Sequence, residues 1–200
     1  MGTREKIEAY AAERLGEQSP GLTHTYRVYR TARLLSNSFD DELLHASCML
    51  HDINMDRPHP RKAAEEAEAF LVGIGFPKEK TGAVIHAIQE HGYYGNPDSK
   101  EGFMLFDADQ LDSMGITGLI QFGQAYHDHA ELDRVMGQVE MEGTSILRLA
   151  RSKEIARQKS EERNLAISLL NRLSGGASPY KDLVCGTPAS DNTLLPQSRK

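Results

Sequence analysis

Helical periodicity is the feature that most constrains the fold of this chain. Apolar residues recur at the three- and four-residue spacing of amphipathic helices, and no stretch of the 200-residue sequence shows the alternation expected of a half-buried strand. Trp is absent and aromatic residues make up 6% of the chain, so the core must be aliphatic and rich in Met. We therefore expect an all-α fold, built as a single helical bundle.

Capping residues, prolines and glycines divide the sequence into separate helices. Thr23 and either Asp40 or Asp41 are predicted N-caps, because their side-chain oxygens can accept from the first free backbone N–H groups of a helix. Two prolines place residues 53–60 in a loop. The expected helices cover about residues 3–15, 23–35, 40–51, 61–72, 77–91, 100–113, 117–129 and 142–173.

The last expected helix and the segment after it differ in composition. Residues 142–173 are laced with charges, which is typical of a solvated face, and Leu165 and Leu169 are among the apolar residues expected to face inward. If exposed, a stripe of Leu and Ile on this helix could join two copies in a homodimer. Residues 174–200 hold several prolines and few core-forming residues. We expect residues 1–173 to form one domain and residues 174–200 a disordered tail.

Charge and hydropathy narrow the classes of partner. A formal net charge of -6 disfavours binding to duplex nucleic acid, whose phosphates would be repelled, whereas a small phosphorylated metabolite can bind where a metal neutralises it. We expect no membrane insertion, because no apolar stretch approaches the about 20 residues that a spanning helix needs. The charged N-terminus lacks the apolar core of a secretion signal, so a cytoplasmic location is expected.

Four side chains are candidates for a metal site. His24 lies near the start of one expected helix, the dipeptide His51-Asp52 ends another, and Asp109 lies on a later helix. Two imidazoles and two carboxylates together would make a mixed nitrogen and oxygen site for a divalent metal. Water bound to such a metal is a stronger acid than bulk water, so hydroxide could act as a nucleophile near neutral pH.

The helix that holds Asp109 contains a second candidate, Asp107. The two carboxylates lie about 200° apart around a helix, so they cannot both point into one site. Glu101, Leu105, Asp109 and Asp112 follow one another at spacings of four, four and three, and so share one stripe of the helix. One of the two aspartates can be the ligand, and the other must have another role.

Three segments carry a resemblance to a known family: His24-Thr-Tyr-Arg27-Val, Met-Leu-His51-Asp52-Ile and Phe-Asp107-Ala-Asp109-Gln-Leu-Asp112. In this order and on a helical background, they resemble the HD-domain superfamily of metal-dependent phosphohydrolases. The likeness is greatest to the small stand-alone HD hydrolases of bacteria and archaea, and it covers about residues 20–170. A lone His-Asp pair would be weak support, but the ordered set is specific.

The resemblance implies which residues bind metal. The implied ligands of the first metal are His24, His51, Asp52 and Asp109. Asp109 is favoured over Asp107 because it directly precedes the x-Leu of the motif, and the stripe shared with Glu101 supports the same choice. His59 and His91 stand where many family members place two further histidines, which bind a second metal or contact the substrate phosphate.

The resemblance also implies hydrolysis of a phosphate ester or phosphoanhydride, which we expect to belong to a nucleotide. Asp52 or Glu101 could steer the proton of the attacking water. Arg27 suits phosphate oxygens, and Arg61 and Lys62 beside the loop are further candidates for phosphate contact. The ligand set suits Mn, Fe, Co, Ni or Mg, one or two per chain, and affinity order cannot choose among them.

Two other functions use the same residues. Some HD-fold proteins hold a di-iron pair that activates dioxygen, and the six residues named as ligands could supply that site. Alternatively, the chain could be a non-catalytic module that binds metal or nucleotide. Iron content with oxygen-dependent turnover would indicate the first alternative, and tight nucleotide binding without turnover the second.

Overall fold

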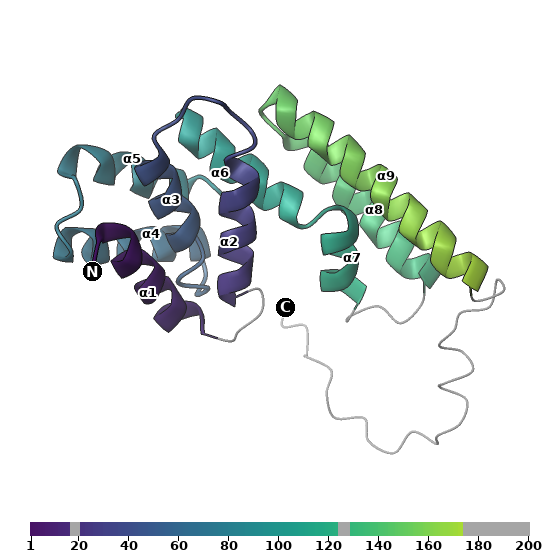
Figure 1. The fold of residues 1–200 in the computed structure, drawn as a ribbon, viewed down its shortest axis with the longest axis horizontal. Helices are drawn as coiled ribbons and strands as arrows, with labels where there is room; N and C mark the ends of the chain where they lie inside the picture. Colours follow the sequence, from purple (N-terminus) through teal and green to yellow (C-terminus); the bar gives the residue numbers. More distant parts are fainter. Residues whose placement is uncertain (17–20, 124–128, 174–200) are drawn as a thin grey trace, which may run out of the picture.

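A computed structural model describes residues 1–16, 21–123 and 129–173, and within these ranges the regular structure is entirely helical (Figure 1). The helices are α1 (Thr3–Leu15), α2 (Gly21–Ala32), α3 (Asp41–Leu50), α4 (His59–Gly73), α5 (Lys78–Gln89), α6 (Lys100–Asp112), α7 (Gly115–Gly123), α8 (His129–Ile146) and α9 (Ala150–Leu173). The prediction of an all-α fold is confirmed. None of these helices is long and apolar enough to cross a bilayer.

Helix α3 is at the centre of the first group of helices. It packs against α1, α2, α5 and α6, and α4 covers α5 beside it (Figure 1). Residues 43–50 of α3 are all buried. A helix that is apolar on nearly every side is stable only when other elements surround it. Helices α7, α8 and α9 form a second group that joins the first through α6.

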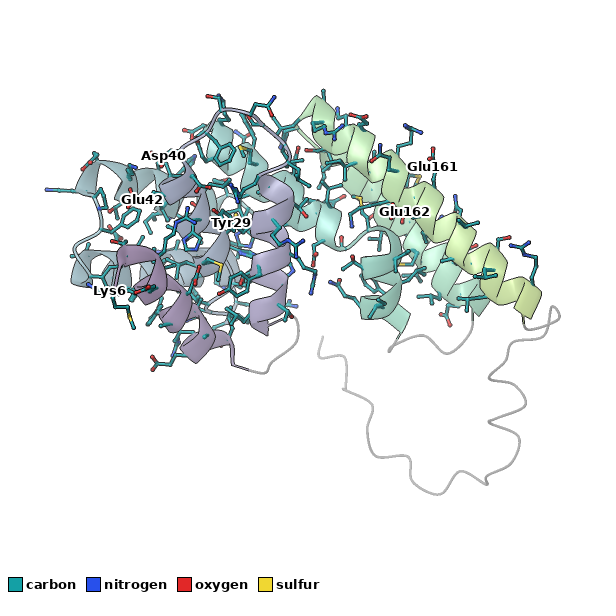
Figure 2. The ribbon with its side chains drawn as sticks, viewed as in Figure 1. Lys6, Tyr29, Asp40, Glu42, Glu161 and Glu162 are labelled. Carbon is teal, nitrogen blue, oxygen red and sulfur yellow. The ribbon has the colours of Figure 1, made fainter. Side chains whose placement is uncertain are left out.

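The start of α3 is fixed by side chains. The Asp40 carboxylate accepts from the backbone N–H groups of Glu42 and Leu43, so the predicted cap is confirmed. Lys80 of α5 donates to both Asp40 and Glu42, which are labelled in Figure 2. The helix ends at Leu50, with His51 at its C-cap. The His-Asp dipeptide therefore leaves a rigid, buried helix at a defined point.

Three expected boundaries are wrong. Thr23 is not an N-cap, because α2 begins at Gly21, whose φ of +58° suits glycine. The same helix ends at Ala32, three residues early. His59, expected in a loop, is the first residue of α4, and Pro60 follows it in the first turn, where a missing N–H costs little.

The C-terminal part differs most from expectation. Residues 130–141, which we expected outside any helix, belong to α8, and the single helix expected over 142–173 is broken between Ile146 and Ala150. The break has a physical cause: the Asp107 carboxylate of α6 accepts from the backbone N–H groups of Arg148 and Leu149, each at 2.8 Å. A carboxylate from another helix therefore holds the short segment between α8 and α9 directly before α9 begins.

The outer side of α9 is charged as expected, with Glu161 and Glu162 exposed (Figure 2). Leu165 and Leu169, expected to face inward, are 67% and 48% exposed. Their half of α9 extends away from α1–α6 and has fewer helices to pack against (Figure 1). The homodimer stays a prediction, and the predicted disordered tail, residues 174–200, lies outside the described residues.

Candidate metal centre

The four predicted ligands of the first metal meet between α2, the end of α3, and α6. His24 Nε2 lies 3.2 Å from His51 Nε2 and 3.2 Å from Asp109 Oδ1. Asp52 Oδ2 lies 3.6 Å from His24 Nε2 and 3.5 Å from His51 Nε2. We call these four residues the first ligand group.

His59 and His91 lie directly beside this group. Their Nε2 atoms are 3.3 Å apart, and Asp52 Oδ1 lies 3.5 Å from that of His91 and 3.8 Å from that of His59. We call Asp52, His59 and His91 the second ligand group. Asp52 therefore presents one carboxylate oxygen to each group, and all six predicted ligands are brought together.

The imidazoles are oriented so that their lone pairs face one another. His51 Nδ1 donates to the Cys48 carbonyl at 2.8 Å, and His91 Nδ1 donates to the Ile88 carbonyl at 2.6 Å. His24 Nδ1 is 2.8 Å from Asp112 Oδ2. With Nδ1 protonated, Nε2 of a neutral ring carries a lone pair, and two such atoms repel unless a cation lies between them.

The distances fit a bound cation. Metal–nitrogen bonds of about 2.0–2.1 Å place neighbouring ligand atoms roughly 2.8–3.4 Å apart in octahedral or tetrahedral geometry. The Nε2 separations of 3.2 Å in the first group and 3.3 Å in the second lie in this range. The residues present therefore suit a divalent metal ion in the first group, with histidines placed for another in the second.

Electrostatics favour positive charge at this point. Burial works against a charged His24, but Asp109 and Asp112 raise the pKa of its imidazole to about 10. Burial would raise the pKa of Asp52, but His51 and His91 lower it to about 2. Despite burial, hydrogen bonds from His24 and His51 hold the pKa of Asp109 far below its usual value. Both carboxylates are ionised at neutral pH, as metal ligands must be.

Behind His24, Asp112 and Arg27 form a support. Arg27 Nε and Nη2 each donate to one oxygen of Asp112 at 2.8 Å, which is a two-pronged ion pair. The same carboxylate holds His24 Nδ1, so Arg27 fixes the orientation of the imidazole through Asp112. The predicted direct contact between Arg27 and a phosphate must compete with this pairing.

The structure does not bring Glu101 to the site. Its carboxylate accepts from the backbone N–H of Asp40 at 2.8 Å, at the opposite end of α3 from His51. Glu101 shares a stripe with Asp109, but eight residues correspond to about 12 Å along a helix. The expected catalytic role of Glu101 is corrected: its carboxylate links the start of α6 to the start of α3.

Arg61 and Lys62 lie in the first turn of α4, close in sequence to His59, and both are exposed and form ion pairs with Glu65. Lys62 is three residues after His59 and so lies on the same side of α4, whereas Arg61 points away from that side. Of the two, Lys62 is the better placed to reach a ligand at the second group.

A feature that we did not predict lies on the open side of His59. A pocket of about 380 Å³ is lined by His59, Pro60 and the loop after α5, including Tyr93 and Tyr94. Tyr94 is 95% exposed, and its ring centroid is 5.0 Å from that of Tyr93. Two adjacent aromatic residues between Gly92 and Gly95 were the signal in the sequence that could have indicated this surface.

Comparisons with known proteins agree with this geometry. The family model described as HD domain matches residues 21–114, the segment that contains all six predicted ligands. A sequence comparison with curated proteins gives no match.

Solved structures with the same fold cover most of the chain. A predicted HD superfamily hydrolase from an uncultured Thermotogales bacterium is 20% identical, with a TM-score of 0.64 over 86% of this chain and 91% of that one. YpgQ of Bacillus subtilis, solved in complex with ADP, is 21% identical, with a TM-score of 0.68 over 84% and 93%. An HD-superfamily hydrolase from Bacillus thuringiensis is 18% identical, with a TM-score of 0.68 over 87% and 97%. The family-model match therefore assigns residues 21–114 to the HD-domain family, and the shared fold and the paired His and Asp side chains agree with that assignment.

Proposed function

We propose that this protein is a metal-dependent phosphohydrolase that cleaves a phosphate ester or phosphoanhydride of a small metabolite, and of a nucleotide in particular. The observation that carries the proposal is the position of Asp52, which offers one oxygen to each of two adjacent ligand groups. HD superfamily hydrolases of the same fold support hydrolysis, and the ADP in YpgQ supports a nucleotide.

The proposed chemistry divides between the metal and the chain. A divalent cation supplies Lewis acidity, which makes water nucleophilic near neutral pH and neutralises phosphate charge. His24, His51, Asp52 and Asp109 would hold it. Asp52 keeps its negative charge at neutral pH and can orient the water by accepting its proton in a hydrogen bond. Arg27 acts as a positioning residue through Asp112, and Lys62, with Arg61 further out, is the proposed phosphate contact.

The pocket beside His59 is the proposed place for the rest of the substrate. Tyr93 and Tyr94 line it and offer aromatic surface to a nucleobase, a contact worth about 1–3 kcal/mol per base. Because His59 borders the same pocket, a base there would place its phosphates toward the ligand groups.

The test combines metal content with phosphate release. Protein purified without chelator or affinity tag is analysed for metals and assayed on nucleotides and phosphomonoesters with Mn, Mg, Co and Ni. We expect at least about one metal per chain and release of phosphate or pyrophosphate. Asp52→Ala should lose its bound metal and its activity while keeping its helix content. Glu162 is an exposed acidic residue on α9, so Glu162→Ala should keep metal and activity. Full activity of Asp52→Ala would refute the assignment.

A second candidate function, dioxygen activation at a di-iron pair, is favoured by the two neighbouring histidine groups joined through Asp52. It predicts two irons per chain, oxygen consumption and no phosphate release. Tight nucleotide binding without turnover, with each metal tried, would instead support a non-catalytic module. The same set of measurements therefore separates the three functions.

A further inference from the structure

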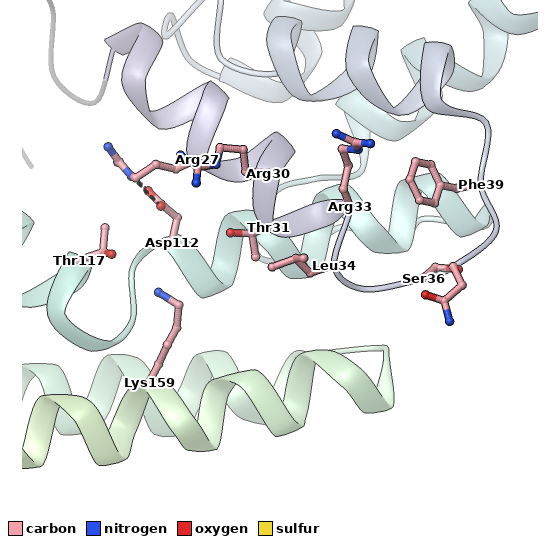
Figure 3. Close-up of a pocket in the computed structure, with 11 residues that line it drawn as sticks. Arg27, Arg30, Thr31, Arg33, Leu34, Ser36, Phe39, Asp112, Thr117 and Lys159 are labelled. Carbon is pink, nitrogen blue, oxygen red and sulfur yellow. Dashed lines mark hydrogen bonds and ion pairs between the residues drawn. The ribbon is translucent and has the colours of Figure 1, made fainter.

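A cavity of about 750 Å³ lies between α2, the segment after it and α9, away from the pocket beside His59 (Figure 3). Arg27, Arg30 and Arg33 of the α2 side line it, and Lys159 reaches toward it from α9. The remaining lining residues are Thr31, Leu34, Ser36, Asn37, Phe39, Asp112 and Thr117. Its volume is in the range of small-molecule binding sites.

The cavity is strongly positive in a chain whose formal net charge is -6. Four cationic side chains line it against one carboxylate, Asp112, which is already bound by Arg27 and His24. Arg33 lies 3.5 Å from a carboxylate oxygen of Asp41. Neither Arg30 nor Lys159 forms an ion pair with a carboxylate in the part of the chain that the structure describes. Among the described residues, two cations therefore border the cavity without a carboxylate at ion-pair distance, although Asp112, Glu162 and Glu140 favour the charged form of Lys159 from further away.

Lys159 is the cation of this cavity with the weakest compensation for its burial. Its side chain is half-buried, and Nζ donates only to the Met114 carbonyl, at 3.3 Å. Burial lowers the pKa of the ammonium group, which means that its charged form is poorly compensated. Lys80 of α5, by contrast, has its charge compensated, because it donates to the carboxylates of Asp40 and Glu42 at 3.1 and 2.8 Å. An anion in the cavity would supply what Lys159 lacks.

This cavity is separate from the metal centre. Asp112 lies between the two, and its Oδ2 is 2.8 Å from Nδ1 of His24. Nε2, on the far side of the same imidazole ring, faces the first ligand group. An anion that reaches Arg30 and Lys159 would therefore be on the opposite side of the imidazole from the metal ligands. It could not at the same time be the phosphate that undergoes reaction there.

We propose that the cavity is a second ligand site, which binds a phosphorylated small molecule carrying two adjacent phosphate groups. Cations approach from α2 on one side and from α9 on the other, so two phosphates can each find a partner. Guanidinium groups match phosphate oxygens in geometry as well as charge. Phe39 and Leu34 offer apolar surface to the remainder of the ligand. The inference does not rest on the proposed hydrolytic function.

The test uses imidodiphosphate, a diphosphate analogue that resists hydrolysis, in calorimetric titrations of the full chain. Asp109→Ala serves as the background in which the metal centre is disabled. Into this background we introduce the double substitution Arg30→Gln and Lys159→Gln. The matched control is Lys153→Gln with Arg157→Gln, which removes two exposed cations of α9 outside the cavity. The same pairs are also made in the otherwise unchanged chain, in case Asp109→Ala folds poorly.

We expect the control to bind one equivalent of probe in the Asp109→Ala background. The Arg30 and Lys159 pair should weaken binding about a hundredfold, since each charge-assisted contact corresponds to about a tenfold change in affinity. In the unchanged chain, the pair should remove one binding event and leave turnover intact. Equal affinity of the two pairs, or no binding by the control, would overturn the proposal. A failure of phosphate release in the assays above would leave this comparison unaffected.

Discussion

Asp107 and Asp109, two residues apart on α6, serve different parts of the molecule. The Asp107 carboxylate accepts from the backbone N–H groups of Arg148 and Leu149 at the start of α9. Asp109 Oδ1 lies 3.2 Å from His24 Nε2 in the first ligand group. Their opposite directions follow from the about 200° that separates them around the helix. One turn of α6 therefore both builds the metal centre and anchors the C-terminal helices.

Exchanging these two aspartates for alanine should separate stability from metal binding. Asp107→Ala removes two hydrogen bonds that hold the segment before α9 and should lower the free energy of unfolding by about 1–3 kcal/mol while leaving metal content unchanged. Asp109→Ala should abolish tight metal binding with a smaller loss of stability. Denaturant unfolding and elemental analysis of both variants measure the two effects. Loss of metal in Asp107→Ala with a normal unfolding curve would reverse our assignment.

Part of the site could be predicted because helix periodicity determines which side of a helix a residue occupies. Helix phase showed that Asp107 and Asp109 cannot face the same site, and the resemblance to the HD-domain superfamily then favoured Asp109. Distance along a helix also matters. Glu101 lies on the same side of α6 as Asp109, but it is too far along the helix and contacts Asp40 instead. Helix partners are not visible in the sequence, so the role of Asp107 in holding the segment before α9 could not be predicted.

The missed helix α8 has an equally specific cause. Its buried positions include Met136, Glu140 and Gly143, so only one of these three is a large apolar residue. Glu140 is buried because its carboxylate accepts from the backbone N–H of Gly115, and Gly143 leaves room for the Met114 side chain, which a Cβ would meet at 2.5 Å. Packing of this kind gives no hydrophobic periodicity.

Asp112→Asn should weaken metal binding without removing a metal ligand. The amide keeps the shape of the side chain but cannot hold His24 Nδ1 and Arg27 with a full negative charge. Loss of such a partner of a metal-binding histidine typically costs about 10- to 100-fold in metal affinity. Titration with Mn measures it. Gln121→Ala is the control, because Gln121 also donates to Asp112 but carries no charge. Equal affinity of Asp112→Asn and the unchanged protein would contradict the positioning role.

His59→Ala should remove one metal of two. At saturating Mn, we expect two ions per chain in the unchanged protein and one in this variant, because the first ligand group stays complete. His86→Ala is a matched control: its side chain is 36% exposed, as is that of His59, but it pairs with Asp98 instead. Elemental analysis after gel filtration gives the stoichiometry. An unchanged metal content in His59→Ala would exclude it as a ligand.

His45 should make stability depend on pH. Its imidazole is buried, Nε2 is 3.0 Å from Glu8, and Nδ1 has no hydrogen-bond partner among the described residues. Burial lowers the pKa of the His45 imidazole in the folded protein below its ordinary value of 6.5, so the unfolded chain takes up the proton first. The contribution of His45 to the free energy of unfolding is therefore complete above pH about 6.5 and is lost as pH falls toward the pKa of the folded protein. The free energy of unfolding falls by at most about 1.4 kcal/mol per pH unit through this group.

His45→Gln should flatten that part of the profile. Urea unfolding between about pH 5 and 7 compares the variant with the unchanged protein, and the difference between the two isolates His45 from the other histidines. The difference should shrink as pH falls, because only the unchanged protein loses stability through this group. Parallel profiles would show that His45 has the same pKa in the folded and unfolded states.

Deletion of the residues after Gly176 should leave metal content and turnover unchanged. All six predicted metal ligands lie within residues 24–109, and the last buried residue of α9 with a described side chain is Arg163. In the sequence, the deleted segment therefore follows both the ligand groups and the packed part of α9. Activity assays and thermal unfolding of the shortened and full chains test this directly. A large loss of turnover with unchanged unfolding would mean that the C-terminal segment contributes to the substrate site.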